Sequence, residues 1–263
     1  MPQLGPGLNT FKTRCSMVVS IRISRRLVNC SWDSHIHIID PKNYPFPNIG
    51  IPTIPHERTM AGAFSNASRL SLPNMVFVQV SKYSNDNTWI LDALREVGPS
   101  RGRGVVAFDP DTIDSQTFRK WRDLSVRGVR LNLRLTRGKV SKIEIQAALH
   151  KYAGKSRLLK MWPIGPYTDM VILEYIQSLV SEPGVKIVIE YFGSPKIMDD
   201  PLVYAKISAP YILSKDPEFK DLEGLLKSLL GMRDREGVMF ASDWPYTQCK
   251  SFDTKPFLEK YVE

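Results

Sequence analysis

The chain is poor in the residue types that build disulfide frameworks and membrane spans. Three of its 263 residues are cysteines, Cys15, Cys30 and Cys249, and their positions form neither adjacent pairs nor a Cys-x-x-Cys motif. This usage excludes a disulfide scaffold and favours a reducing compartment. No stretch approaches the roughly 18 to 20 uninterrupted apolar residues that a transmembrane helix needs. We therefore expect a soluble protein with no membrane partner.

Acidic residues are missing from the beginning of the chain, where no Asp or Glu precedes Asp33. Such a composition is typical of a mitochondrial presequence, but a disordered extension, or a start placed too far upstream, gives the same pattern. We expect residues 1–30 to form a basic, poorly ordered N-terminal extension outside the core. The predicted location is cytoplasmic, with the mitochondrion as the alternative. The basic residues of this stretch are Lys12, Arg14, Arg22, Arg25 and Arg26.

Nucleic-acid motifs are also lacking, in spite of a formal net charge of +9 from 36 Lys and Arg against 27 Asp and Glu. A basic balance of this size invites a nucleic-acid partner, but the basic residues are mostly scattered along the chain. We therefore expect no nucleic-acid binding. A basic pocket for small anionic molecules accounts better for the charge.

The sequence does contain a regular alternation of β-rich runs and helical stretches, which is the pattern of parallel strands joined by crossover helices. Eight such units predict an α/β fold of the (β/α)8 barrel type. With 263 residues, 43% of them hydrophobic, the chain can form one barrel domain, which we place at 31–263. The predicted strands cover 31–39, 75–80, 104–109, 128–133, 158–164, 185–190, 204–207 and 237–242. The predicted helices cover 58–70, 87–96, 115–124, 141–153, 169–181 and 216–232.

Polar residues follow the predicted strands at the ends where barrel enzymes carry their chemistry. His35 and His37 end the first strand, and strand residues two apart point to the same face. Both imidazoles can therefore converge on one metal ion or one polar substrate, and Asp243, after the last strand, can complete the site. A lone His-x-His is common by chance, but several polar groups on one rim favour a site. The other polar residues at or near strand ends are Asp109, Arg130 and Glu190.

Six stretches between Trp32 and the C-terminus occur in a characteristic order. They are Asp33-Ser34-His35-Ile36-His37 with Asp40-Pro41; Val78-Gln79-Val80-Ser81 with Asn85-Asp86-Asn87; Arg101-Gly102-Arg103-Gly104-Val105-Val106 through Asp109-Pro110-Asp111; Arg127-Gly128-Val129-Arg130-Leu131-Asn132-Leu133; Lys206-Ile207-Ser208-Ala209-Pro210-Tyr211; and Ala241-Ser242-Asp243-Trp244-Pro245. Together they resemble the amidohydrolase-related family (amidohydrolase 2 type) of the metal-dependent hydrolase superfamily, in the branch that contains 2-pyrone-4,6-dicarboxylate lactonase.

The resemblance implies a (β/α)8 barrel and a hydrolase that opens small carboxylated lactones or related rings. In this branch no divalent metal is needed. By position, the resemblance implies that Asp243 is the general base for water, that His35 and His37 polarise the carbonyl or hold the substrate, and that Arg130 contacts a carboxylate. Each role suits its residue type, because a base needs a carboxylate or imidazole, an oxyanion needs fixed donors, and arginine offers a bidentate fork.

The chain departs from the family pattern at two positions. Tyr191 stands where the family has a histidine after strand six, and Tyr246 stands where a histidine often follows Trp-Pro. Tyrosine can donate a hydrogen bond but is a poor base at neutral pH and a weak metal ligand. We therefore interpret both tyrosines as candidate substrate contacts. Tyr44, in the long loop after the first strand, is a further candidate, although an aromatic residue in such a loop is more often a packing anchor.

No cofactor is expected, but one metal centre stays chemically feasible. His35, His37 and Asp243 supply three ligands for a single Zn²⁺ or Mn²⁺ with an open position. The remaining histidines, His56 in the long loop and His150 on a predicted outer helix, do not suffice for a binuclear site.

The resemblance also implies a closing helix after strand eight, and the chain ends about one helix into that region. We therefore expect the last helix to be truncated, so that apolar strand surface stays exposed or is covered in a homo-oligomer.

Three functions compete at this point. The first is a hydrolase that opens a lactone or ester bond in a small carboxylated ring with water activated by Asp243. The second is a degenerate barrel that binds small carboxylates without catalysis. The two tyrosines at histidine positions and the short C-terminus support it. The third is a zinc-dependent decarboxylase, against which Tyr191 counts.

Overall fold

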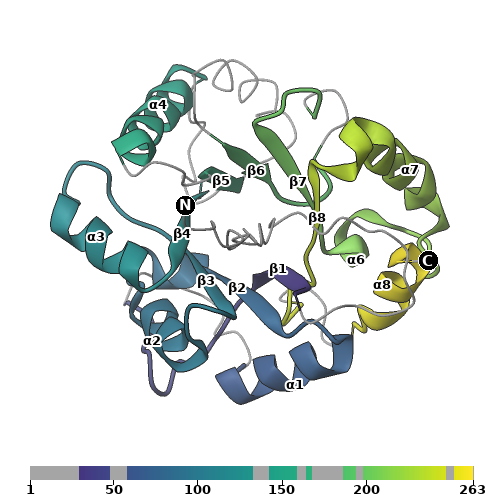
Figure 1. The fold of residues 1–263 in the computed structure, drawn as a ribbon, viewed down its shortest axis with the longest axis horizontal. Helices are drawn as coiled ribbons and strands as arrows, with labels where there is room; N and C mark the ends of the chain where they lie inside the picture. Colours follow the sequence, from purple (N-terminus) through teal and green to yellow (C-terminus); the bar gives the residue numbers. More distant parts are fainter. Residues whose placement is uncertain are drawn as a thin grey trace, which may run out of the picture.

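The computed structural model describes residues 30–47, 58–132, 142–158, 164–167, 186–193, 198–246 and 252–262. Within these ranges eight strands form one sheet in which each strand pairs in parallel with its sequence neighbours. Figure 1 shows them as an inner ring. The strands are β1 (Trp32–Ile36), β2 (Asn74–Val78), β3 (Gly102–Val106), β4 (Val126–Asn132), β5 (Ile164–Tyr167), β6 (Ile187–Ile189), β7 (Val203–Ile207) and β8 (Val238–Phe240).

The sheet closes into a barrel between β1 and the residues that follow β8. Ile36 forms a parallel bridge with Trp244. The backbone N–H of His37 donates to the carbonyl of Trp244 at 2.8 Å, and the N–H of Asp243 donates to the carbonyl of His35 at 3.1 Å. We call this contact between residues 33–37 and 242–244 the closing seam. It brings His35 of β1 and His37, which follows β1, next to Asp243.

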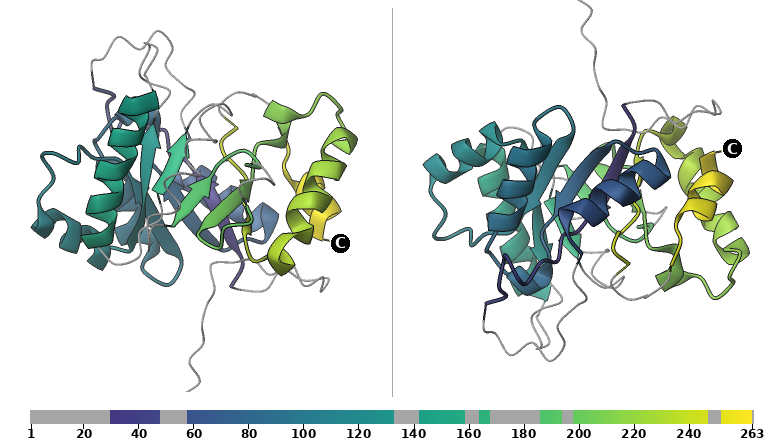
Figure 2. Two further views of the ribbon diagram at one scale, coloured as in Figure 1. Left: turned by 90° about the horizontal axis from the view of Figure 1, so that it is seen from above. Right: turned by 90° about the horizontal axis from the view of Figure 1, so that it is seen from below.

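The longer helices surround the strands, as Figures 1 and 2 show from three directions. No helix in the described ranges is long and apolar enough to cross a membrane. The α-helices are α1 (Met60–Leu70), α2 (Thr88–Val97), α3 (Ser115–Asp123), α4 (Lys142–Leu158), α6 (Pro210–Leu213), α7 (Glu223–Gly231) and α8 (Lys255–Val262). The short 3-10 helices are η1 (Ser81–Tyr83), η3 (Lys220–Leu222) and η4 (Met232–Arg235).

Alternation of side chains along the strands separates the apolar layer under the helices from the barrel interior. On β2, Met75 and Phe77 are buried in one cluster with Trp89 of α2. The residues between and after them, Val76 and Val78, belong to a separate cluster. This is the period of two expected for a strand with two buried faces.

A second apolar cluster lies between α7, α8 and the last strands. Leu226 and Leu229 of α7 and Phe257 of α8 are buried in it together with Val203 of β7 and Val238 of β8. The helix that the sequence predicted to be truncated therefore contributes to the core, and α8 lies beside α1 in Figure 1.

The (β/α)8 architecture predicted from the sequence is confirmed, but the predicted fifth strand is wrong. Leu158, the predicted start of that strand, ends α4, and β5 covers Ile164–Tyr167; residues 159–163 lie outside the described ranges. The strand contains Gly165 and Pro166, residue types that disfavour a strand; pairing with β4 fixes it there. The predicted helix over 216–232 is divided between η3 and α7. The predicted N-terminal extension and the helix over 169–181 lie outside the described residues.

We expect Gly104→Ala to destabilise the barrel. A Cβ at Gly104 would lie 2.9 Å from Cδ1 of Leu94 and 3.0 Å from Cγ2 of Ile90, and both side chains are buried. Overpacking of this kind costs about 1–3 kcal/mol, measurable as a lower free energy of unfolding in denaturant titrations. In the control Gly154→Ala the added Cβ, on an exposed turn of α4, meets nothing within 4 Å. The control should gain roughly 0.5–1 kcal/mol from reduced chain entropy. Equal stability of the two variants would contradict this packing.

Candidate functional site

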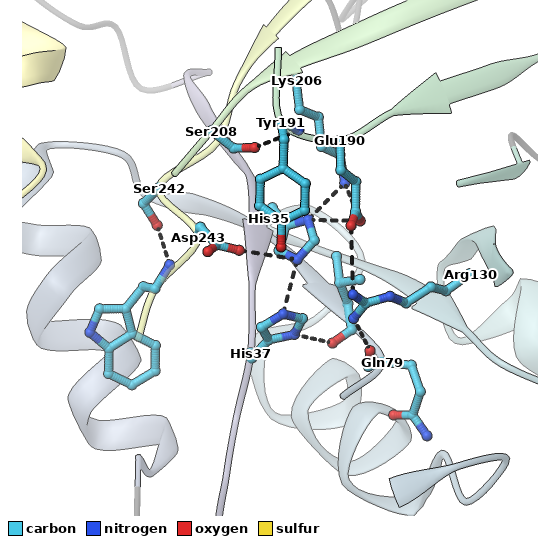
Figure 3. Close-up of polar contacts among 12 residues, drawn as sticks. His35, His37, Gln79, Arg130, Glu190, Tyr191, Lys206, Ser208, Ser242 and Asp243 are labelled. Atoms are coloured by element: carbon cyan, nitrogen blue, oxygen red, sulfur yellow. Dashed lines mark hydrogen bonds and ion pairs between the residues drawn. The ribbon is translucent and has the colours of Figure 1, made fainter. Parts of the chain in front are cut away.

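Two neutral histidines, one in β1 and one directly after it, form the centre of the site (Figure 3). Nδ1 of His37 lies 2.7 Å from the carbonyl oxygen of Val78 on β2. A carbonyl can only accept, so Nδ1 of His37 carries the hydrogen and its Nε2 presents a lone pair. That Nε2 lies 3.0 Å from Nε2 of His35. Both imidazoles are buried, and burial lowers the pKa of His35 to about 4 and that of His37 well below its usual value.

Two charged side chains lie against the other nitrogen of His35, and a third contacts one of them. Nδ1 of His35 lies 3.1 Å from Nζ of Lys206 on β7 and 3.2 Å from Oε1 of Glu190, the residue after β6. Oε2 of Glu190 lies 3.6 Å from a guanidinium nitrogen of Arg130 on β4, and Lys206 is 3.8 Å from Oε1. All of these side chains are buried, so the charges compensate one another away from water.

The pKa values of these charged groups follow from burial and from their neighbours. Burial raises the pKa of Glu190, but contact with His35 and the charges of Arg130 and Lys206 outweigh it and hold the pKa below its usual value. Burial lowers the pKa of Lys206, and Glu190 opposes that shift. Glu190 thus lies between two basic side chains and the buried imidazole of His35.

Asp243 faces the histidines from the opposite side of the closing seam. Its Oδ1 lies 3.6 Å from Nε2 of His35, and its Oδ2 accepts a hydrogen bond of 2.7 Å from the hydroxyl of Tyr211 on α6. Asp243 has a left-handed backbone with φ of 59°, which aspartate tolerates better than most residues. Burial raises its pKa to about 7, and the hydrogen bond from Tyr211 limits that rise. A carboxylate with such a pKa can accept a proton near neutral pH.

The buried carboxyl group of Asp33 joins the two sides of the closing seam. Its Oδ1 accepts from the backbone N–H of His35 at 3.2 Å and from that of Ser242 at 2.9 Å. Burial raises the pKa of Asp33 to about 6. One buried carboxyl group therefore ties the strand that carries the histidines to the residue that precedes Asp243.

The donor set of the site fits a single metal ion. His35, His37 and Asp243 each offer one ligand atom, and these atoms lie within 4.8 Å of one another. Two nitrogens that each lie about 2.0–2.1 Å from one zinc ion are roughly 3.0–3.4 Å apart, and the two Nε2 atoms are separated by 3.0 Å. Because His37 donates Nδ1–H to Val78, its Nε2 is already oriented as a ligand.

A cavity of about 150 Å³ lies beside Arg130, at the ends of β2, β3 and β4. Arg130 is buried and donates to the carbonyl of Gln79. Most of its lining residues are of polar types and one of them, Arg130, is basic, which suits a small anionic group. The polar lining residues are Gln79, Ser81, Ser84, Asn85 and Arg130.

The predicted site residues fall into two groups. His35, His37, Asp243 and Arg130 come together as the sequence predicted, and the side chain of Tyr191 points into the site in Figure 3. The backbone N–H of Tyr191 donates to Oγ of Ser208 at 3.2 Å.

The hydroxyl groups of the other two predicted tyrosines make contacts on outer helices. That of Tyr246 lies 3.4 Å from Asn66 Oδ1 and 3.3 Å from a guanidinium nitrogen of Arg69, both on α1. That of Tyr44 donates to Asp92 of α2 at 3.1 Å. A role for either as a substrate contact stays a prediction. His150 is exposed on α4, and His56 lies outside the described residues.

Sequence reasoning placed Glu190 at a strand end and Lys206 and Tyr211 in a family-like stretch but gave none of them a role. All three contact the predicted residues. Lys206 could have been found as a charged residue inside a short apolar strand. Tyr211 follows a turn in which Ala209 has φ of 48°, and no sequence signal indicates that this turn directs the tyrosine to Asp243.

The chain is similar in structure to several solved hydrolases. A probable 2-pyrone-4,6-dicarboxylic acid hydrolase of Acinetobacter baumannii, with citric acid bound, matches with a TM-score of 0.69 and 20% identity over 88% of this chain and 91% of that chain. A second 2-pyrone-4,6-dicarboxylic acid hydrolase-like protein, from Pseudomonas putida, matches with a TM-score of 0.66 and 21% identity over 88% and 90%.

An amidohydrolase of Burkholderia multivorans with bound zinc matches with a TM-score of 0.69 and 16% identity, over 88% of this chain and 90% of that chain. No protein-family model matches the chain. At these identities the likeness shows the fold, and the neighbours are of the kind that the sequence motifs resemble.

We expect Tyr211→Phe to raise the pKa of Asp243 above its value of about 7, because the lost hydrogen bond stabilises the ionised carboxylate. An NMR titration of carbon-labelled aspartate carboxyl groups in chelator-treated protein measures this shift. The control Tyr246→Phe removes a hydroxyl that contacts Asn66 and Arg69 instead, and it should leave the titration of Asp243 unchanged. Equal shifts in both variants would refute the assigned contact.

Proposed function

We propose that the protein is a hydrolase that opens a lactone or ester bond in a small carboxylated ring. The observation that carries the proposal is the position of Asp243, a buried carboxylate with a pKa of about 7 that lies 3.6 Å from a neutral imidazole. A base and a hydrogen-bond donor side by side at the carboxyl ends of barrel strands suit the addition of water to a carbonyl group.

The reaction divides between Asp243 and His35. The carboxylate of Asp243 takes a proton from water while the water oxygen bonds to the ring carbonyl carbon. The carbonyl electron pair moves to its oxygen, and the N–H of His35 donates to the resulting oxyanion. When the carbonyl reforms, the ring C–O bond breaks and the leaving oxygen takes the proton back from Asp243. The products are the ionised base and an open-chain acid, which is a hydroxy acid from a saturated lactone and an enol acid, tautomer of a keto acid, from a pyrone.

Arg130 is the proposed carboxylate contact. Arg130 lines the 150 Å³ cavity together with serine and asparagine residues, and arginine pairs with carboxylates through two parallel N–H bonds. Support comes from the Acinetobacter baumannii neighbour, which holds citric acid, a small polycarboxylate. Tyr191, whose side chain points into the site, is a second proposed substrate contact. Partners beyond such a substrate, and a homo-oligomer, stay predictions.

A single divalent metal ion is compatible with the same site. His35, His37 and Asp243 would hold it, and when bound it would supply a Lewis acid for the substrate carbonyl. The neighbour from Burkholderia multivorans is a zinc-bound amidohydrolase of the same fold. A metal-assisted form of the hydrolase is therefore the second candidate.

We expect Asp243→Asn to lower the rate of hydrolysis of 2-pyrone-4,6-dicarboxylate and related muconolactones by roughly 10²- to 10⁴-fold, the usual contribution of a general base. The rate is followed by the loss of ring absorbance in protein treated with chelator, and again after zinc or manganese is added back. Asp111→Asn, which removes an exposed partner of Lys151, serves as the control with wild-type activity.

The same assay separates the competing functions. Turnover that survives chelation supports the metal-independent hydrolase, and turnover only after metal addition supports the metal-assisted one. A folded protein that hydrolyses none of these compounds, yet melts at a higher temperature with a dicarboxylate, would show that the barrel binds without catalysis. Release of carbon dioxide would indicate a decarboxylase instead.

We expect Arg130→Lys to raise KM for a dicarboxylated lactone roughly 10- to 100-fold with a smaller change in kcat, because a hydrogen bond to a charged group contributes about 1.5–3 kcal/mol. A substrate analogue without the contacted carboxylate should show little difference between the two proteins. Arg127→Lys is the control on the same strand, since Arg127 donates to the backbone carbonyls of Arg122 and Val126. A KM that stays unchanged in Arg130→Lys would remove Arg130 from the substrate site.

A further inference from the structure

Two side chains approach the same atom of His35, and only one of them can use it at a time. Nζ of Lys206 lies 3.1 Å from Nδ1, and Oε1 of Glu190 lies 3.2 Å from it. An amine or ammonium group donates to a bare nitrogen, whereas a carboxylate accepts from an N–H. The position of one hydrogen on the neutral ring of His35 therefore decides which partner is bonded.

The position of the hydrogen on His37 determines what faces Nε2 of His35. His37 donates Nδ1–H to Val78, so its Nε2 offers only a lone pair to Nε2 of His35, 3.0 Å away. If His35 carries its hydrogen on Nε2, that N–H donates to His37 and Lys206 donates to the bare Nδ1. Every nitrogen of the pair then has a hydrogen-bond partner, and the space between the two Nε2 atoms is closed by a hydrogen.

The alternative places the hydrogen of His35 on Nδ1, where it is donated to Glu190. Two lone pairs then face each other across 3.0 Å, an arrangement that repels unless a cation lies against both. Asp243, the third member of the candidate ligand group, supplies a negative charge beside them. A histidine that ligates a metal usually donates its other N–H to a carboxylate or carbonyl, as His35 to Glu190 and His37 to Val78 would here.

We propose that Glu190 and Lys206 are opposing positioning residues that set whether this site holds a divalent cation. Bonding of His35 to Glu190 stabilises the form that binds one borderline cation such as Zn²⁺ through His35, His37 and Asp243. Bonding of His35 to Lys206 stabilises the cation-free form, in which the His35 N–H donates to Nε2 of His37. The inference shares its site with the proposed function, but its test measures cation binding and the hydrogen position, so either can fail without the other.

The charges around the site favour or oppose cation binding in the same way as the two alternative hydrogen bonds of His35. Lys206 and Arg130 repel a dication, whereas Glu190 and Asp243 attract it, and all four side chains are buried in a low-dielectric interior. Two basic and two acidic side chains nearly balance. The position of the hydrogen on His35 can therefore decide whether the site binds a cation. Asp33, the other buried carboxyl group, accepts backbone N–H groups at the closing seam.

NMR of nitrogen-labelled histidine rings tests the hydrogen position directly in the wild-type protein. With chelator, we expect the hydrogen of His35 on Nε2; with zinc, we expect it on Nδ1 and both Nε2 atoms shifted by coordination. His37 should keep its hydrogen on Nδ1 in both states. A hydrogen on Nδ1 of His35 in the chelated protein, or zinc that moves neither ring, would overturn the proposal. This experiment needs no variant and therefore does not depend on the folding of one.

Variants then separate the two partners through zinc affinity, measured by competition with a chromogenic chelator. Glu190→Gln should weaken zinc binding about 10- to 100-fold, as expected for loss of an outer partner of a ligand. Lys206→Met should lower the Kd and move the hydrogen of His35 to Nδ1 even without metal, a change that loss of charge alone does not cause. The control Lys186→Met removes a lysine that lies over the ring of Tyr204 and should match the wild type. Wild-type affinity in both folded site variants would refute the opposition of Glu190 and Lys206.

Discussion

The site depends on how the barrel closes. A sheet of parallel strands can end in two edges, but here β1 bonds to the residues after β8, through the N–H of His37 to Trp244 and the N–H of Asp243 to His35. Both bonds involve residues whose side chains form the site, so closure and function use the same few positions. Asp33 reinforces the contact by accepting N–H groups from both sides.

Burial gives these groups their chemistry. In water the imidazole of His35 would be half protonated near pH 6.5 and the carboxyl of Asp243 fully ionised at neutral pH. Inside the barrel the pKa of His35 falls to about 4 and that of Asp243 rises to about 7, both chiefly because of desolvation. As a result, His35 is a neutral hydrogen-bond donor opposite Asp243, a base whose pKa is near 7. The more strongly charged residues, Glu190, Arg130 and Lys206, compensate one another around them.

Much of this could be predicted from the sequence. Alternating strand and helix patterns gave the barrel, and the rule that chemistry lies at strand ends brought together His35, His37, Arg130 and Asp243. The fifth strand was misplaced because its glycine and proline are residue types that rarely indicate a strand. Its position depends on pairing with β4. Tyr246 was chosen as a site tyrosine by its place in the chain.

The residue that reaches Asp243 is instead Tyr211, through the left-handed turn at Ala209. The roles of Glu190 and Lys206 depend on which strand ends meet across the barrel interior. The distances between side chains on different strands depend on barrel closure and strand register, which local sequence patterns do not encode.

The account rests on Asp243 as a base with a pKa near 7, and the pH dependence of hydrolysis tests it most directly. For a carboxylated pyrone and chelator-treated protein, kcat/KM should rise with pH through a midpoint of about 7 and then level off, because the carboxylate must be ionised to accept a proton from water. A rate that is already maximal at pH 5, as for an aspartate with an ordinary pKa, or one that falls as pH rises through 7, would contradict it.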